Sequence, residues 1–266
     1  MLTNSNISLQ PYHSFASQEL ASYFSTITSK EDIVQLVQWS MEKHLPFLVI
    51  GSGTNILFTK NYDGIVAKME IMGIKKIEET ASQVLLEVGA GENWHHFVSY
   101  CVQKGWGGIE NLSLIPGTVG AAPVQNIGAY GSEIKDTIES VYVLDVLKDE
   151  YKTLKNSECK FAYRTSLFKE EPGRYIVLSM TCVLKKKAGL NIGYKDVQEY
   201  FSFKKIKEPT LKQVRDAVIE IRTRKLPDVR EYGTAGSFFK NVIVSQAQSQ
   251  ELVAKYPEMV VHAVNR

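Results

Sequence analysis

The stretch Ile109–Gly131, IENLSLIPGTVGAAPVQNIGAYG, constrains the fold of this chain more than any other segment. It is rich in glycine and alanine, contains two prolines, and carries one charged side chain, Glu110. Apolar residues stand between the small ones, but they follow neither the period of a helix nor the alternation of a strand. The stretch is therefore predicted to be an irregular, largely buried backbone segment whose N–H and C=O groups need partners.

A bound anion is one candidate partner for that backbone. Glycine permits positive φ angles and close approach, so successive amides can converge on an anion, and a diphosphate is the large anion most commonly held in this way. We interpret Ile109–Gly131 as a ligand cradle; the alternative is a Gly/Pro-rich loop that only reverses the chain. A second candidate phosphate loop is Gly51–Asn55, GSGTN, because it follows directly on a short apolar strand predicted at Phe47–Ile50.

Hydrophobic periodicity predicts the elements around these loops. The expected helices are Lys30–Leu45 with Ser29 as N-cap, Trp94–Lys104, and Thr210 to about Arg224 with Thr210 as cap. The other expected strands are Gly64–Met69, Val84–Val88, Val141–Leu147, Tyr151–Leu154 and Arg174–Leu184. No internal repeat or flexible linker is evident, so subdomain boundaries are placed where the predicted topology changes, near Met69 and Leu226.

Composition and charge exclude several classes of protein. The 266 residues are enough for two or three subdomains with a substantial core. With 44% hydrophobic and 23% charged residues, the chain is close to globular averages, which argues against a disordered or fibrous protein. A net charge of +2 creates no global attraction to nucleic acid or to a membrane. The lysine clusters at 185–187 and 204–207 are interpreted as solvated faces, so no nucleic-acid site is predicted.

Cysteine and histidine patterns argue against a disulfide framework and a metal site. Cys101, Cys159 and Cys182 are far apart and odd in number, and we expect buried, reduced thiols. His95 and His96 are adjacent on a predicted helix, where neighbouring side chains point about 100° apart. They are therefore interpreted as core or surface histidines rather than as joint ligands of one ion.

The chain shows no targeting signal and no membrane span. Its N-terminus lacks a basic start followed by an apolar core, and its longest largely apolar run, Tyr175–Leu184, is too short to cross a bilayer. These features predict a soluble, cytoplasmic protein, and we expect a monomer.

Arg164 and Ser237 stand in settings that suit chemistry. Arg164 is flanked by Tyr163, Thr165 and Phe168, so its cation could lie over a π system or pair with an anion. The alternative is a surface arginine whose stem lies over a tyrosine. Ser237 lies among glycines and phenylalanines in GTAGSFFKN, without the GxSxG or SxxK pattern of a nucleophile. Its hydroxyl could donate a proton inside an apolar pocket.

The chain resembles the UDP-N-acetylenolpyruvoylglucosamine reductases, the MurB family of bacterial peptidoglycan synthesis. Four motifs occur in the order and approximate spacing of that family: PFLVIGSGTNILF, IPGTVGAAPVQNIGAYG, FAYRTSLFK, and IRTRKLPD followed by GTAGSFFKN. The resemblance covers nearly the whole chain. The loop LNIGYKD around Tyr194 is similar to the subgroup that has a mobile, substrate-covering tyrosine.

The resemblance implies an α+β flavoenzyme with a two-subdomain FAD-binding fold of the vanillyl-alcohol-oxidase (PCMH-type) kind. The expected FAD-binding subdomains are 1–69 and 70–226, with a smaller α+β substrate-binding subdomain, incomplete here, at 227–266. FAD is expected to bind non-covalently, because the cradle contains no His or Cys. The implied reaction is the NADPH-driven reduction of UDP-N-acetylglucosamine enolpyruvate to UDP-N-acetylmuramate, in which reduced flavin delivers hydride to the vinyl carbon.

The resemblance also implies site residues. Arg164 matches the family's arginine that stabilises the enolate, and Ser237 matches the serine that protonates the enol carbon. The implied FAD-binding residues are Gly51, Ser52, Gly53, Thr54, Asn55, Pro116, Gly117, Thr118, Val119, Gly120, Ala121, Ala122, Gln125, Asn126, Gly128, Ala129, Tyr130 and Arg222. The implied substrate-binding residues are Tyr163, Tyr194, Lys225, Gly236 and Asn241. No metal is expected.

The chain departs from the family pattern near its end. Val242 stands where the family has proline, and His262 lies in an altered context where the family has a nucleotide-contacting tyrosine. The family continues beyond Arg266 with a strand whose glutamate works with the arginine, so we expect this C-terminal segment to be missing and apolar faces such as Met259–Val261 to be exposed. Two alternatives stay open: a truncated, catalytically impaired FAD-binding paralogue, and an FAD-dependent oxidase of the same fold.

Overall fold

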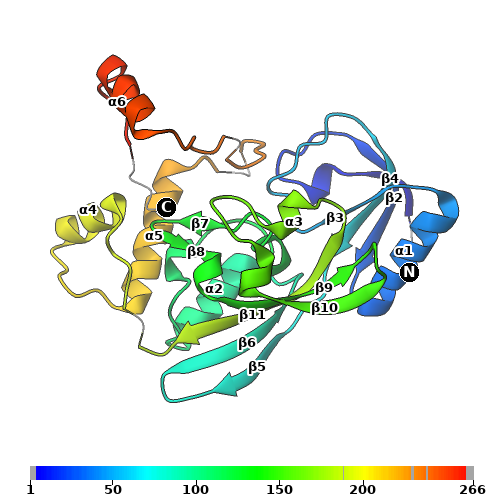
Figure 1. The fold of residues 1–266 in the computed structure, drawn as a ribbon, viewed down its shortest axis with the longest axis horizontal. Helices are drawn as coiled ribbons and strands as arrows, with labels where there is room; N and C mark the ends of the chain where they lie inside the picture. The colour runs from blue at the N-terminus through cyan, green and yellow to red at the C-terminus, as the bar shows by residue number, and fades with distance from the viewer. Residues whose placement is uncertain (1–3, 188, 229–230, 238, 262–266) are drawn as a thin grey trace. The chain divides into compact units, whose positions relative to one another are not determined.

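The chain divides into two units. The computed structural model describes residues 4–187, 189–228, 231–237 and 239–261. The first unit is Met1–Gly236 and the second is Ser237–Arg266. The first unit contains both large sheets, the GSGTN loop and the cradle (Figure 1).

The first sheet has the strand order β1-β2-β4-β3. Its strands are β1 (Asn4–Ser8), β2 (Leu20–Ile27), β4 (Tyr62–Met69) and β3 (Phe47–Ile50). β2 and β3 both run parallel to β4, so the connection between them is a crossover through α1 (Lys30–Lys43). α1 begins after Ser29 because Ser29 Oγ accepts the N–H of Asp32 at 3.2 Å, while Asp32 accepts the N–H of Ser29 at 3.0 Å.

The second sheet is antiparallel and has the order β10-β9-β11-β6-β5. Its strands are β10 (Glu150–Lys155), β9 (Ile138–Asp145), β11 (Tyr175–Lys185), β6 (Gln83–Gly89) and β5 (Ile74–Glu79). β11 is the central strand and pairs with both β9 and β6. It is buried along most of its length, as expected for a strand with a neighbour on each side.

Helices and short elements complete the first unit. The α-helices are α2 (Trp94–Gln103), α3 (Leu167–Glu170), α4 (Lys195–Lys204) and α5 (Leu211–Lys225). The 3-10 turns are η1 (Gln10–Tyr12), η2 (Glu110–Leu112), η3 (Val119–Ala121), η4 (Ile134–Asp136) and η5 (Asn156–Cys159), and β7 (Gly128–Ala129) pairs with β8 (Ser132–Glu133). α4 and α5 share a small apolar core of their own.

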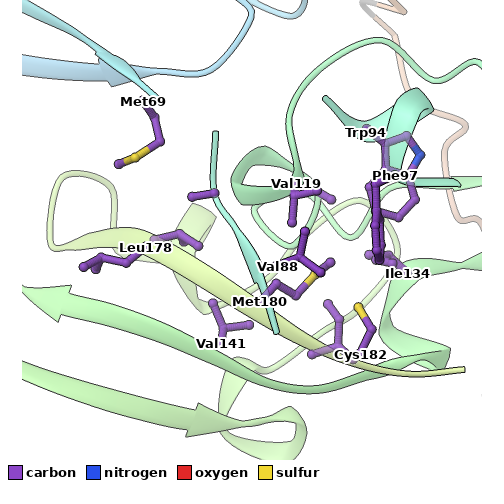
Figure 2. Close-up of a cluster of buried hydrophobic side chains, with 14 of the residues drawn as sticks. Met69, Val88, Trp94, Phe97, Val119, Ile134, Val141, Leu178, Met180 and Cys182 are labelled. Atoms are coloured by element: carbon purple, nitrogen blue, oxygen red, sulfur yellow. The ribbon is translucent and has the colours of Figure 1, made fainter. Parts of the chain in front are cut away.

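One continuous apolar core joins the two sheets, α1, α2 and the cradle. In Figure 2, Trp94 and Phe97 of α2 lie together with Ile134, and Val119 of the cradle lies beside Val88 and Met180. Trp94 is fully buried, and its Nε1 donates to the carbonyl of Leu112 at 2.8 Å. The cradle is therefore part of the core rather than a surface loop.

Most predicted elements are confirmed, with ends that differ by one or two residues. The strand predicted at Val141–Leu147 is shifted: β9 spans Ile138–Asp145, and Leu147 is 78% exposed in the following turn. β2, β5 and α4 were not predicted. The sequence of β5, IKKIEE, is mostly exposed at the edge of the sheet, so it lacks the alternation that marks a half-buried strand.

The second unit contains α6 (Gln246–Lys255), which begins after Ser245 in a capping box with Gln248. None of the described residues of this unit is buried. The apolar side chains expected to be exposed are exposed, with Val260 at 76% and Val261 at 48%. His262 lies outside the described residues. Within the described part of the chain, no helix combines the length and the apolar character that a membrane span needs.

The three thiols are free and buried, as predicted. Burial raises the pKa of Cys182 to about 12 and that of Cys159 to about 12, and it raises the pKa of Cys101 as well. Because the thiolate is the reactive form, we expect the native protein to be inert to an aromatic disulfide reagent at mildly alkaline pH, and all three thiols to react in denaturant. Rapid reaction of a thiol in the native protein would contradict this burial.

Candidate active site

Two glycines of the GSGTN loop are required by close contacts. Gly53 has φ +61°, and a Cβ there would lie 2.1 Å from the Tyr12 carbonyl oxygen. A Cβ on Gly51 would lie 2.5 Å from Thr118 Oγ1 in the cradle. Thr54 Oγ1 also donates to the Pro116 carbonyl at 3.3 Å. The structure therefore brings together the two segments that were predicted separately as phosphate loops.

Several backbone amides of these loops have no acceptor among the described residues. Among the described residues, no hydrogen bond has the N–H of Gly51, Ser52, Gly53, Thr54 or Asn55 as its donor. The same holds for Gly117 and Thr118 of the cradle. Unpaired amides in the GSGTN loop, close to unpaired amides in the cradle, can bind the oxygens of a diphosphate. Because FAD contains a diphosphate, the residues of these two loops suit FAD.

The cradle is irregular and largely buried, as predicted, and its short elements are no longer than three residues. Its middle packs on the end of β6: the N–H of Gly120 donates to Ala90 O at 2.9 Å, and a Cβ on Gly120 would lie 2.5 Å from the Ala90 Cβ. Val119, Ala122 and Asn126 are buried there. Pro116, Ala121, Gln125 and Ala129 lie on the same segment, with Gln125 and Ala129 partly exposed.

Asn126 holds its part of the cradle with both ends of its carboxamide. Nδ2 donates to Ala162 O at 3.0 Å, and Oδ1 accepts the N–H of Lys135 at 3.1 Å. Asn126 is fully buried and has φ +46°. Its side chain therefore already has protein partners that explain why an asparagine stands here.

Leu114, at the start of the cradle, is held in the left-handed region at φ +57°. Its N–H donates to His95 Nδ1 at 3.1 Å, and its carbonyl accepts from Arg222 Nε at 3.3 Å. Burial, with a further contribution from Arg215, lowers the pKa of His95. A neutral His95 is required, because only an unprotonated Nδ1 can accept this bond.

Arg164 lies against the cradle. Its guanidinium donates to Gly128 O at 2.6 Å and lies 5.2 Å from the ring centroid of Tyr163. A Cβ on Gly128 would lie 2.8 Å from Arg164 NH1, so a larger residue there would displace the guanidinium from the position shown. The contact with the Tyr163 ring fits both interpretations made from the sequence, a functional cation over a π system and an arginine whose stem lies over a tyrosine, and the structure adds the contact with the cradle.

Tyr130, Tyr194, Arg222 and Lys225 gather where the cradle meets α5. The rings of Tyr130 and Tyr194 meet edge to face with centroids 5.3 Å apart. Burial raises the pKa of Tyr130, and burial lowers the pKa of Arg222, although Tyr130 opposes that change. Lys225 Nζ pairs with Asp196 at 2.7 Å. Two residues predicted to bind FAD, Tyr130 and Arg222, thus lie close to two residues predicted to bind the substrate, Tyr194 and Lys225.

The segment Gly233–Gly236 is attached to the GSGTN loop. Ser14 donates its hydroxyl to Thr234 O at 2.5 Å and its N–H to Gly53 O at 3.2 Å. Asn55 Nδ2 donates to Ala235 O at 2.7 Å. Ser237 and Asn241, which follow along the chain, belong to the second unit and are exposed. Their roles stay predictions.

Three residues of this arrangement were not assigned their role from the sequence: Ser14, His95 and Asn111. Each acts through a partner distant in the chain, up to 220 positions for Ser14 and Thr234. Asn111 lies within the cradle that the sequence predicted, but nothing in its neighbouring residues distinguishes it from the other polar residues there, such as Gln125 and Asn126. Among the described residues, no group of three or more His, Cys, Asp or Glu is placed to hold a metal ion.

The His95 contact predicts a pH effect on stability. Because the folded-state pKa of His95 lies below its unfolded value near 6.5, the folded state is penalised as pH falls below about 6.5. In His95→Gln, a neutral amide oxygen can accept the Leu114 N–H, so this variant should lose less stability than wild type between neutral pH and about pH 5 in denaturant titrations. His96→Gln, at the exposed neighbouring position, is the control and should lose nearly as much stability as wild type, since His96 makes the smallest of the three contributions to the lowered pKa of His95. Equal losses in all three proteins would rule out the effect.

Comparisons with known proteins show which family this chain resembles. Residues 21–150 match the family model described as the FAD binding domain. A UDP-N-acetylenolpyruvoylglucosamine reductase from Amoebophilus asiaticus is 45% identical over 97% of this chain and 76% of that protein. Another from Neisseria gonorrhoeae is 44% identical over 94% of this chain and 73% of that protein.

The fold agrees as well. The crystal structure of UDP-N-acetylenolpyruvylglucosamine reductase (MurB) from Thermus caldophilus covers 91% of this chain with a TM-score of 0.67, at 21% identity and over 76% of its own length. This likeness confirms the expected α+β fold of the FAD-binding kind. Sequence identity of this size, along almost the whole of this chain and three quarters of each relative, shows that the chain belongs to the UDP-N-acetylenolpyruvoylglucosamine reductase family.

Proposed function

We propose that this protein reduces UDP-N-acetylglucosamine enolpyruvate to UDP-N-acetylmuramate in peptidoglycan precursor synthesis, with NADPH as reductant and non-covalently bound FAD. The observation that supports this most directly is Arg164, a cation held against Gly128 of the cradle. In the reaction, a hydride adds to the terminal vinyl carbon and a proton to the adjacent carbon, so the C=C bond becomes a C–C single bond and NADPH becomes NADP⁺.

FAD would lie between residues 1–69 and 70–226, on the GSGTN loop and the cradle. When bound, it supplies the hydride. The unpaired amides of Gly51–Asn55 would bind its diphosphate. Gly51 and Gly53 let this loop pack against Thr118 and Tyr12, because these neighbours leave no space for a Cβ at either position.

Arg164 would act on the substrate carboxylate. As the vinyl carbon gains a hydride, negative charge grows on the carboxylate side, and a fixed guanidinium stabilises it without reorganisation. The bond to Gly128 O and the contact with Tyr163 hold the guanidinium in place. Ser237 would supply the proton, as the family resemblance implies.

Arg222, Lys225, Tyr130 and Tyr194 would bind the sugar nucleotide and the neighbouring part of FAD. A diphosphate is anionic, and Arg222 and Lys225 supply two cations beside two tyrosine rings. Lys225 is paired with Asp196 and half exposed, so a phosphate can compete for it.

We expect Gly53→Ala to lose FAD. The added methyl group would meet the Tyr12 carbonyl and would strain a residue at φ +61°. The matched control is Gly189→Ala, because a Cβ there meets nothing within 4 Å. The measurement is flavin absorbance per chain after purification. Equal flavin content in the two variants would argue against the GSGTN loop as the FAD site.

Anaerobic stopped-flow absorbance tests the proposed roles. In Ser237→Ala, NADPH should still bleach the flavin, whereas reoxidation by the enolpyruvyl sugar nucleotide should slow by about 10² to 10⁴. Arg164→Ala should slow the same step by about 10² to 10³. Ser249→Ala, in the same unit as Ser237, is the control. If Ser237→Ala also loses flavin reduction by NADPH, the role of Ser237 is structural. If the wild-type protein itself turns over near background, the alternative of a truncated, catalytically impaired FAD-binding paralogue is favoured.

A further inference from the structure

Asn111 is a buried polar side chain that joins the cradle to the loop carrying Tyr194. It is only 1% exposed. Its Nδ2 donates to Tyr130 O at 2.9 Å and to Asn191 O at 2.8 Å. Tyr130 lies near the end of the cradle, and Asn191 lies 80 positions after Asn111 along the chain. One amide group therefore ties two distant segments together.

The two acceptors decide which way the carboxamide points. Rotating the group by half a turn would bring Oδ1 against two carbonyl oxygens, which is repulsive. Oδ1 itself has no hydrogen-bond partner among the described residues, so no competing donor fixes the opposite orientation. The position needs two donors on one short side chain, and an ionised aspartate would supply none.

The Tyr194 loop has further attachments to the same place. Asn191 Nδ2 donates to Gly131 O at 2.8 Å, and Asn191 Oδ1 accepts the N–H of Gly193 at 3.3 Å. Tyr194 is the N-cap residue of α4 and packs edge to face on Tyr130. Tyr130 has φ +49°, so Asn111 also holds a carbonyl that belongs to a strained residue.

We propose that Asn111 is a positioning residue that holds the Tyr194 loop against the cradle, ready to receive the sugar nucleotide. This inference rests on the proposed function, because that function puts the substrate beside Tyr194. Without the Asn111 donors, the loop spends less time in the position shown, and the apparent affinity for a ligand that contacts Tyr194 falls by that fraction. Among the described residues, Asn111 makes no hydrogen bond to Gly51–Asn55, so the proposed diphosphate segment should keep FAD. Because Asn111 also holds the Tyr130 carbonyl, the FAD content per chain is measured in each variant, and it should equal that of wild type.

Asn111→Leu tests the proposal, since leucine has a similar size and no donor. The matched control is Asn156→Leu: Asn156 Nδ2 also donates to two carbonyls, of Lys135 and Ile138, each at 2.8 Å, and neither belongs to the Tyr194 loop. In the FAD-bound enzyme, Asn111→Leu should raise KM for the enolpyruvyl sugar nucleotide about tenfold, as for loss of about one hydrogen bond. kcat and the rate of flavin reduction by NADPH should stay within about twofold of wild type, and Asn156→Leu should leave KM unchanged.

Hydrogen exchange gives a readout that does not require turnover. Amides of residues 190–196 should exchange faster in Asn111→Leu than in wild type or Asn156→Leu. If the wild-type protein does not reduce the sugar nucleotide, the proposed function is wrong. Faster exchange in Asn111→Leu would still support the role of Asn111 in holding the Tyr194 loop. If Asn111→Leu does not fold, Asn111→Ala replaces it, because alanine also lacks both donors and is smaller. Unchanged exchange and KM in the folded variant would overturn the proposal.

Discussion

The close approach of Gly51 to Thr118 is the contact on which the proposed site depends. β3 of the first sheet ends at Ile50, and the cradle packs on β6 of the second sheet. A side chain at residue 51 would collide with Thr118 Oγ1, so glycine lets the two loops meet. The Thr54 bond to Pro116 forms only because the backbones come this close. Two sheets thus contribute one ligand-binding surface.

The N–H and C=O groups of a buried, irregular backbone cannot pair with a neighbouring strand as they would in a sheet. They need polar side chains as hydrogen-bond partners. Asn126 and Asn111 fill this role within the cradle, His95 fills it from α2, and each is paired with main-chain groups. Leaving one such buried group without a partner costs about 1–3 kcal/mol, so these side chains hold conformations that the backbone would not adopt by itself. Leu114 and Tyr130, both at positive φ, are the residues held in this way.

The cations of the site come from different parts of the first unit. Arg164 follows η5, whereas Arg222 and Lys225 lie on the last turn of α5. The net charge of the chain is only +2, so any attraction of an anionic nucleotide comes from this local arrangement rather than from a global field. Asp196 pairs with Lys225 and so offsets part of that local charge.

Local patterns in the sequence determined much of this protein. The absence of any period in Ile109–Gly131 identified the cradle, and cap residues identified α1 and α5 within two residues, because both signals depend only on neighbouring positions. The exposed edge strand β5 carried no such pattern. Tertiary structure decided how the GSGTN loop and the cradle are held: Ser14, which bonds Gly53, meets Thr234, and Asn111 meets Asn191, across long sequence separations. Such pairings follow from the packing of whole sheets and helices, and no short stretch of sequence contains them.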